Sequence, residues 1–143
     1  MNDFIEQRII TTVKDLLSGR VNEILKDVII PIPKIEFGNY KGGTVIVPVI
    51  ALSTCERTEK ERIIRQDVYS LTITFDLPET RESENYLYAY STAVFMAVSE
   101  NPTLGGIADR AVVTGKKYLI PQKTNCGNVS ELIVYMRITI GEC

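Results

Sequence analysis

Apolar residues recur at spacings of three and four through residues 3–18, with charged residues between them. This is the period of an amphipathic helix whose apolar stripe faces a core. Asn2 or Asp3 can cap the first turn, and Ser18-Gly19 can end the helix. The stripe consists of Phe4, Ile5, Ile9, Val13, Leu16 and Leu17.

The apolar period changes from helical to alternating after a pair of prolines. A second apolar segment over residues 21–30 stops at Pro31-Ile32-Pro33, because two prolines one residue apart prevent a helix from continuing. Residues 34–37 have the pattern of a short strand, and the glycine-rich residues 38–43 that of a turn or loop. Residues 44–53 are apolar and β-branched, and Pro48 favours an edge position or a bulge for this strand.

The clearest strand covers residues 63–76. Its alternation predicts one face that meets a core and one that meets water, which an antiparallel sheet allows. The core side comprises Tyr69, Leu71, Ile73 and Phe75, and the water side Ser70, Thr72, Thr74 and Asp76.

A polar segment, residues 54–62, separates these two strands. Its composition predicts the tip of a long hairpin that projects into solvent. The ordinary interpretation is a solubilising loop, and the functional one is an arm that reaches an adjacent subunit. The charged residues that would contact the neighbour are Glu56, Arg57, Glu59, Lys60, Glu61 and Arg62.

A long helix is predicted over residues 80–100, with Thr80 or Ser83 as its cap. About 20 residues at 1.5 Å rise give a rod of about 30 Å, which can cross four or five strands. Small residues at Ala89, Ala93 and Ala97 allow a sheet to approach closely. A tyrosine stripe of this kind is more often core than a binding site. The stripe comprises Tyr86, Leu87, Tyr90, Val94, Ala97 and Val98.

The helix stops at a glycine turn, in the run Glu100-Asn101-Pro102-Thr103-Leu104-Gly105-Gly106. We expect Gly105 or Gly106 to adopt a positive φ, which glycine tolerates best. Two more strands follow over residues 108–120 and 129–140, with a turn over residues 121–128. Helix, strands, long helix and strands in this order predict one α+β domain over residues 1–143. Its largely antiparallel sheet has four to five strands, with both helices packed on one face.

Composition adds limits to this picture. The 143 residues are 45% hydrophobic and 24% charged, with 16 basic and 18 acidic side chains, so nothing predicts a basic patch for nucleic acid. Cys55, Cys126 and Cys143 are odd in number and widely spaced, as free thiols in a reducing compartment would be. Without a basic leader or an apolar run of about 18 residues, we expect a soluble cytoplasmic protein rather than a membrane protein.

The sequence gives no positive case for an enzyme, a metal site or a cofactor. It contains no histidine, which removes the commonest general base and most transition-metal ligands. The carboxylate pairs Glu59 with Glu61 and Glu82 with Glu84 lie in polar segments typical of solvated surface. The glycine clusters at residues 38–43 and 115–117 lack the pattern of a phosphate loop and are expected to be turns.

Residues 86–106, a helix that ends in Asn-Pro-Thr-Leu-Gly-Gly, resemble the tail-terminator or tail-completion proteins of tailed bacteriophages and prophages. The order of elements along the whole chain is similar as well. The resemblance implies a non-catalytic protein whose subunits form a ring, typically of six, on the last ring of the tail tube. Such a ring stops tube polymerisation and presents a face to the head-tail connector protein. It would assemble in the cytoplasm of the bacterial host and remain in the tail or neck of the virion.

Three alternatives stay open on the sequence. Other neck and head-tail joining proteins have the same size and style. A small soluble α+β domain could bind a ligand between the tyrosine helix and the sheet. An enzyme that uses Cys126 or Ser53 without histidine is the third.

Overall fold

The computed structural model describes residues 4–27, 32–37, 45–60, 64–78, 83–124 and 127–142. Its main sheet has four strands, β3 (Val49–Lys60), β4 (Ile64–Pro78), β5 (Arg110–Thr124) and β6 (Gly127–Glu142). They lie in the order β3-β4-β6-β5, and every neighbouring pair is antiparallel. A separate parallel pair joins β1 (Lys34–Ile35) to β2 (Val45–Ile46). The predicted α+β class and the four-stranded antiparallel sheet are confirmed.

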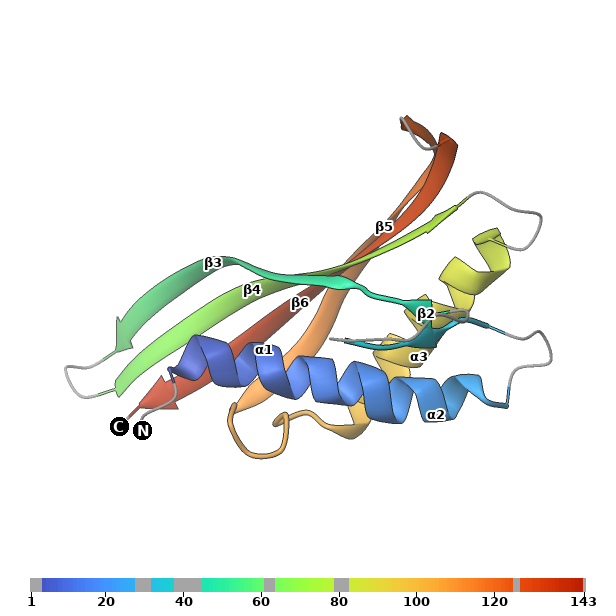
Figure 1. The fold of residues 1–143 in the computed structure, drawn as a ribbon. Helices are drawn as coiled ribbons and strands as arrows, with labels where there is room; N and C mark the ends of the chain where they lie inside the picture. The colour runs from blue at the N-terminus through green and yellow to red at the C-terminus, as the bar shows by residue number, and fades with distance from the viewer. Residues whose placement is uncertain are drawn as a thin grey trace.

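The N-terminal helix is longer than predicted. Helix α1 (Ile5–Leu16) continues through a π-helical turn, η1 (Leu17–Val21), into α2 (Asn22–Leu25) (Figure 1). The prediction that Ser18-Gly19 ends the helix is therefore wrong. Leu17, Val21 and Leu25 continue the buried stripe at every fourth residue, and their burial outweighs the cost of about 1 kcal/mol for a glycine inside a helix. The cap residue is Phe4, and Asn2 and Asp3 lie outside the described residues.

The strands are also longer than predicted at their polar ends. Residues 54–60 belong to β3 rather than to a loop, and residues 121–124, 127 and 128 belong to the β5–β6 pair rather than to a turn. Pairing with the neighbouring strand satisfies the backbone of these segments, whatever the polarity of their side chains. Pro48 lies between β2 and β3, so the strand predicted over residues 44–53 is divided there. β3 is an edge strand of the main sheet, which is the position that Pro48 favoured. The glycine-rich residues 38–43 lie outside the described residues.

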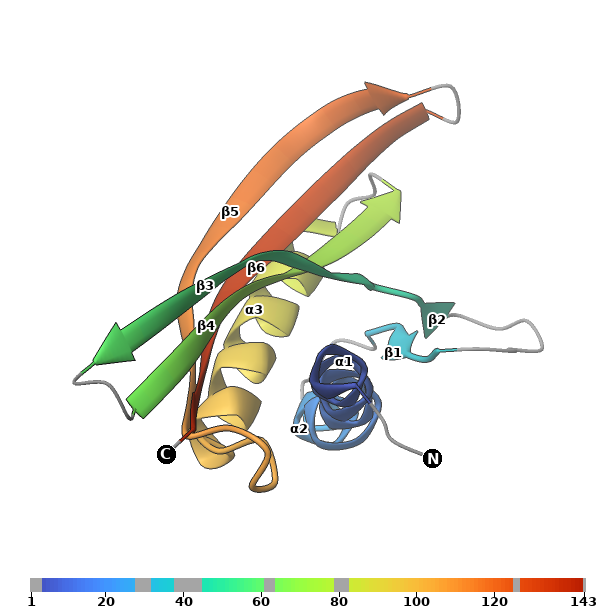
Figure 2. The same ribbon diagram turned by 90° about the vertical axis from the view of Figure 1, so that its left-hand side faces the viewer.

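Both helices cover the same face of the main sheet (Figure 2). Helix α3 (Ser83–Glu100) crosses β4, β6 and β5, and α1 lies near β3. The alternation predicted from the sequence is confirmed, because the predicted core side of β4 is buried and so are the corresponding residues of β6. The buried residues of the two central strands are Tyr69, Leu71, Ile73, Phe75, Leu77, Ser130, Leu132, Val134, Met136 and Ile138.

The predicted core role of the tyrosine helix is confirmed at Tyr90. Its ring stacks on Phe75 of β4 with 5.0 Å between centroids, and its hydroxyl donates a hydrogen bond to the carbonyl of Pro33. Burial of the ring raises the pKa of the hydroxyl well above its ordinary value. One side chain thus joins α3 to the sheet and to the segment that precedes β1.

The turn after α3 has an unusual backbone. Leu104, Gly105 and Gly106 have φ of 49°, 72° and 97°, so the positive φ expected at one glycine occurs at both. The Leu104 side chain is buried in the core, which holds this non-glycine residue in a left-handed conformation. The Asn101 amide donates to the carbonyl of Ala97 at 3.1 Å and caps the last turn of the helix.

We predict that alanine has opposite effects at two glycines. Gly106→Ala should destabilise the fold by about 1 kcal/mol or more, because its φ of 97° disfavours any side chain. Gly19→Ala should stabilise it by about 0.5–1 kcal/mol, because Gly19 is helical and a Cβ there meets nothing within 4 Å. Urea unfolding measures both, and changes of equal sign would contradict the turn geometry.

Candidate functional site

The predicted charged arm is a pair of strands. Glu56 and Arg57 are exposed residues of β3, and Arg57 Nε lies 3.2 Å from Asp67 Oδ1 on β4. This ion pair lies within one subunit, so it already uses one of the charges that the arm would offer to a neighbour. Glu59 and Lys60 end β3, but their side chains are outside the described part of the chain, as are residues Glu61 and Arg62 entirely.

Both edges of the main sheet lack a neighbouring strand in the described part of the chain, although Ala111 N–H, at the start of β5, donates to the carbonyl of Pro102 at 2.7 Å. No described strand pairs with the outer side of β3 or with that of β5. Exposed apolar residues lie beside β3, where Val47 and Val49 are 47% and 59% exposed. An open edge presents unpaired backbone N–H and C=O groups and can accept a strand from another chain.

Helix α3 presents a second apolar surface, which the sequence analysis did not identify. Tyr88, Phe95 and Met96 are 48%, 56% and 42% exposed, and Thr92 lies between them. The sequence does indicate this surface, because α3 has no charged residue between Glu84 and Glu100. The helix is therefore apolar on its outer side as well as on its inner side. We call Tyr88, Thr92, Phe95 and Met96 the α3 stripe.

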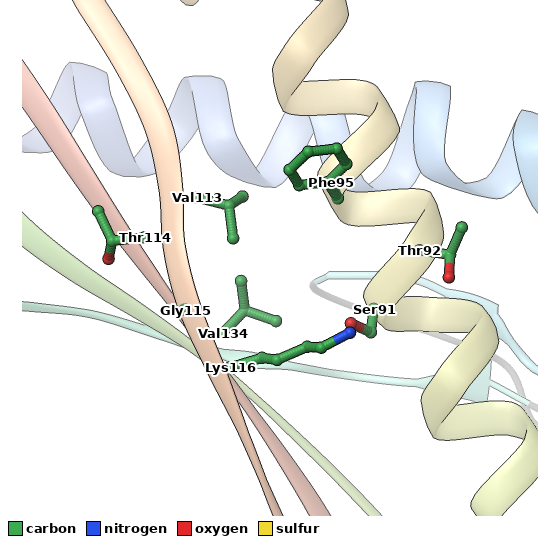
Figure 3. A pocket seen from close by; sticks show the side chains of 8 residues that line it. All are labelled: Ser91, Thr92, Phe95, Val113, Thr114, Gly115, Lys116 and Val134. Atoms are coloured by element: carbon green, nitrogen blue, oxygen red, sulfur yellow. The ribbon is translucent and has the colours of Figure 1, made fainter.

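A groove of about 400 Å³ lies between the α3 stripe and β5 (Figure 3). Phe95 and Val113 face each other across it, and the Lys116 side chain extends towards Ser91 of α3. The ammonium of Lys116 lies 5.7 Å from the centre of the Tyr118 ring. The groove is thus apolar with one cation at its margin. Its lining comprises Ser91, Thr92, Phe95, Val113, Thr114, Gly115, Lys116 and Val134.

The position of the groove bears on the ligand-binding alternative. That alternative places a pocket between the tyrosine helix and the sheet, and the groove does lie between α3 and β5. The buried Tyr90, however, is committed to the core, and none of the tyrosines of α3 lines the groove. An exposed phenylalanine forms its α3 side instead.

The turn after α3 is held by a charged contact with the N-terminal helical segment. The guanidinium of Arg20, in η1, contacts both carboxylate oxygens of Glu100 at 2.7 and 3.0 Å. This hydrogen bonding lowers the pKa of the Glu100 carboxyl and raises the pKa of Arg20. The contact fixes the end of α3 relative to α1, and with it the start of β5.

The face of the sheet opposite the helices is uncovered by any described element (Figure 2). Asp76 of β4 lies directly opposite Glu131 of β6 on this face. Hydrogen bonding with Asp76, partial burial and the charge of Asp76 together raise the pKa of Glu131. This strand pair therefore places two carboxyls side by side, and the protonated form of Glu131 is favoured there.

Comparison with known proteins gives no assignment. No protein-family model matches the chain, and no curated protein sequence matches it. Among the helices in the described ranges, none combines the length and apolar character needed to cross a membrane.

We predict that Glu131→Gln raises the melting temperature at pH 7. A raised pKa in the folded state means that the protonated carboxyl favours folding at low pH, and that this contribution is lost as the pH rises through the folded pKa. The amide imitates the protonated form, so its advantage over the wild type should shrink as the pH falls towards 4. Glu56→Gln is the control, because Val68 lies opposite Glu56. An advantage that does not change with pH would contradict this explanation.

Proposed function

We propose that this protein is a structural protein of tailed bacteriophages or prophages, whose subunits form a ring that caps the tail tube. The ring ends tube polymerisation and provides the face to which the head-tail connector binds. The observation that carries the proposal is a pair of unlike surfaces on opposite edges of one sheet. At one edge lie β5, the α3 stripe and the groove, and at the other lie β3 and the exposed Val47 and Val49.

A ring needs this asymmetry. A closed ring of identical subunits uses a head-to-tail interface, in which one patch of each subunit binds a different patch of the next. Two exposed apolar patches on opposite sides of a subunit suit such an interface, whereas a two-fold dimer needs one self-complementary patch. The resemblance of residues 86–106 to tail terminators adds the tail tube as the partner of the ring.

Capping needs two ring faces that differ. One must match the last ring of tail tube protein, and the other must not accept further tube subunits. The two hairpins of the sheet suit these roles, because β3–β4 and β5–β6 extend past the helices at opposite ends of the sheet (Figures 1 and 2). The protein would then act only by binding other proteins, in the host cytoplasm during assembly and in the tail or neck of the virion. If the protein is instead another neck or head-tail joining protein, its subunits would form a ring through the same surfaces.

The groove supports one other candidate function. An open apolar groove of about 400 Å³ with a lysine at its margin could hold a small apolar acid. Such a protein would gain thermal stability from its ligand and would have no need to associate. The two functions can therefore be distinguished by whether the subunits associate and by whether a ligand raises the thermal stability.

We predict that the wild-type protein forms closed rings as its concentration rises, and that Phe95→Ser shifts it to monomers. Phe95 is 56% exposed, so its loss should remove an intersubunit contact with little effect on the melting temperature. Mass photometry and negative-stain electron microscopy measure the association. Tyr135→Ser, which changes an exposed aromatic residue on the open face of the sheet, is the matched control. Wild-type protein that stays monomeric and also fails to cap growing tail tubes would contradict the proposal.

The charged arm gives a separate prediction. If it contacts a neighbour, replacing Arg57, Lys60 and Arg62 together with serine should weaken ring formation. Exposed ion pairs contribute about 0.2–1 kcal/mol each, so the triple change is needed to see the effect. Assembly at the wild-type concentration would exclude the arm from the interface and leave the ring proposal intact.

A further inference from the structure

We infer that Val47 and Val49 of one copy enter the groove between α3 and β5 of the next copy, so that Asp76 of the first lies against Lys116 of the second. This deepens the proposed function, on which it rests for the partner, a second copy of this chain. It names the two surfaces that meet between subunits. An apolar projection, an apolar groove on the opposite side of the subunit, and opposite charges at their margins support it.

The projection is formed by alternation at the junction of β2 and β3. Ile46 and Pro48 are buried, whereas Val47 and Val49 are 47% and 59% exposed. Successive residues of an extended chain point to opposite sides, so the two exposed valines lie on the same outer side. We call Val47 and Val49 the valine pair. The burial of the residues that alternate with it holds this stretch of chain against the core and presents the valine pair outwards.

The groove offers an apolar recipient for these two side chains. Its volume of about 400 Å³ lies in the range of pockets that enclose drug-sized ligands, which are larger than two valine side chains. Phe95 of α3 and Val113 of β5 face each other across it (Figure 3). Valine is short and stiff at χ1, so it loses little side-chain freedom when it docks.

The two surfaces lie on opposite sides of the subunit. β3 and β5 are the two edge strands of the main sheet, and the valine pair is at the start of β3 whereas the groove lies beside β5 (Figure 2). One subunit can therefore bind two neighbours at once, as a ring requires. The contact uses side chains rather than a strand edge, so the hydrogen bond from Ala111 N–H to the Pro102 carbonyl stays intact.

Two carboxyls lie beside the valine pair. Val49 is opposite Thr74 of β4, and Asp76 follows Thr74 by two residues, on the same open face of the sheet. Asp76 is exposed, and Glu131 of β6 lies directly opposite it. Among the ion pairs of the described residues, none includes either carboxyl. An ammonium group that approaches this pair of carboxyls would therefore be attracted to it.

The margin of the groove carries the complementary charge. Lys116 is exposed, and β5 contains no acidic residue. The Lys116 side chain extends towards Ser91, and no described carboxylate forms an ion pair with it (Figure 3). Because a lysine ammonium is a point charge on a flexible stem, it can turn to meet Asp76 of a neighbour. Opposite charges at the margin of an apolar contact favour the correct partner and orientation.

Charge reversal tests the contact with the intact protein. Lys116→Glu alone and Asp76→Lys alone each place like charges at every contact, and each should raise the concentration for half-assembly by about tenfold or more. The double variant should restore assembly. An equimolar mixture of the single variants should restore it as well, because alternating subunits then oppose unlike charges at every contact. Sedimentation velocity measures the association.

The chain offers matched controls. Lys117→Glu changes the next lysine of β5, which is exposed but does not line the groove, and Asp27→Lys changes an exposed carboxylate after α2. Both should assemble like the wild type. In a separate variant, Val47→Ser and Val49→Ser together should weaken assembly as Phe95→Ser does. The melting temperature should change little, because both valines are exposed.

Each outcome is decisive. If the double serine variant assembles like the wild type, the groove has another occupant, such as a small apolar acid or a different protein, and the inference is overturned while the ring proposal stands. Charge variants that assemble normally, or that fail without rescue by mixing, would overturn the pairing of Lys116 with Asp76. An equal loss in Lys117→Glu would exclude the groove from the contact. Wild-type protein that never assembles, alone or on tail tubes, would overturn this inference and the proposed function together.

Discussion

The stacking of Tyr90 on Phe75 fixes the position of the long helix on the sheet, and most of the structure depends on that position. The pair joins α3 to β4 at the centre of the buried face, and the Tyr90 hydroxyl extends the contact to Pro33. Stacked aromatic pairs contribute about 0.5–1.5 kcal/mol beyond the burial of their area. With α3 fixed there, the groove beside β5, the turn after Glu100 and the start of β5 have fixed places.

A core on one face of the sheet has a direct consequence for function. Because α1 and α3 both pack on the same side, no described element covers the other face of the sheet, and no described strand pairs with either of its edges (Figure 2). The outer side of α3 also remains apolar and exposed. A small α+β domain of this construction has more surface suited to binding than a fold whose sheet is covered on both faces.

The end of α3 shows how a strained segment is kept in place. Three successive residues have positive φ, and one of them, Leu104, cannot relax without leaving the core. The bidentate contact of Arg20 with Glu100 and the Asn101 cap hold the same turn from two other sides. These contacts give the edge strand β5 a defined starting point, which an interface built on that strand requires.

The sequence by itself determined the order of the main helices and strands and the buried face of β4. Alternation at Tyr69, Leu71, Ile73 and Phe75 is a local pattern, and burial followed it because a strand has a period of two. Likewise, the Asn101-Pro102 stop and the glycines after it specify a local backbone. Such features depend on a few consecutive residues, and the sequence is sufficient for them.

Tertiary structure decided what depends on distant partners. Residues 54–60 are polar enough for a loop and became strand because β4 satisfies their backbone, while Gly19 stayed helical because Val21 and Leu25 had a core to enter. The exposure of Phe95 follows from which side of α3 the sheet covers. The bulges on β3 and β5 arise from the pairing of these strands with β4 and β6. No local pattern encodes these features, because each is set by residues far apart in the chain.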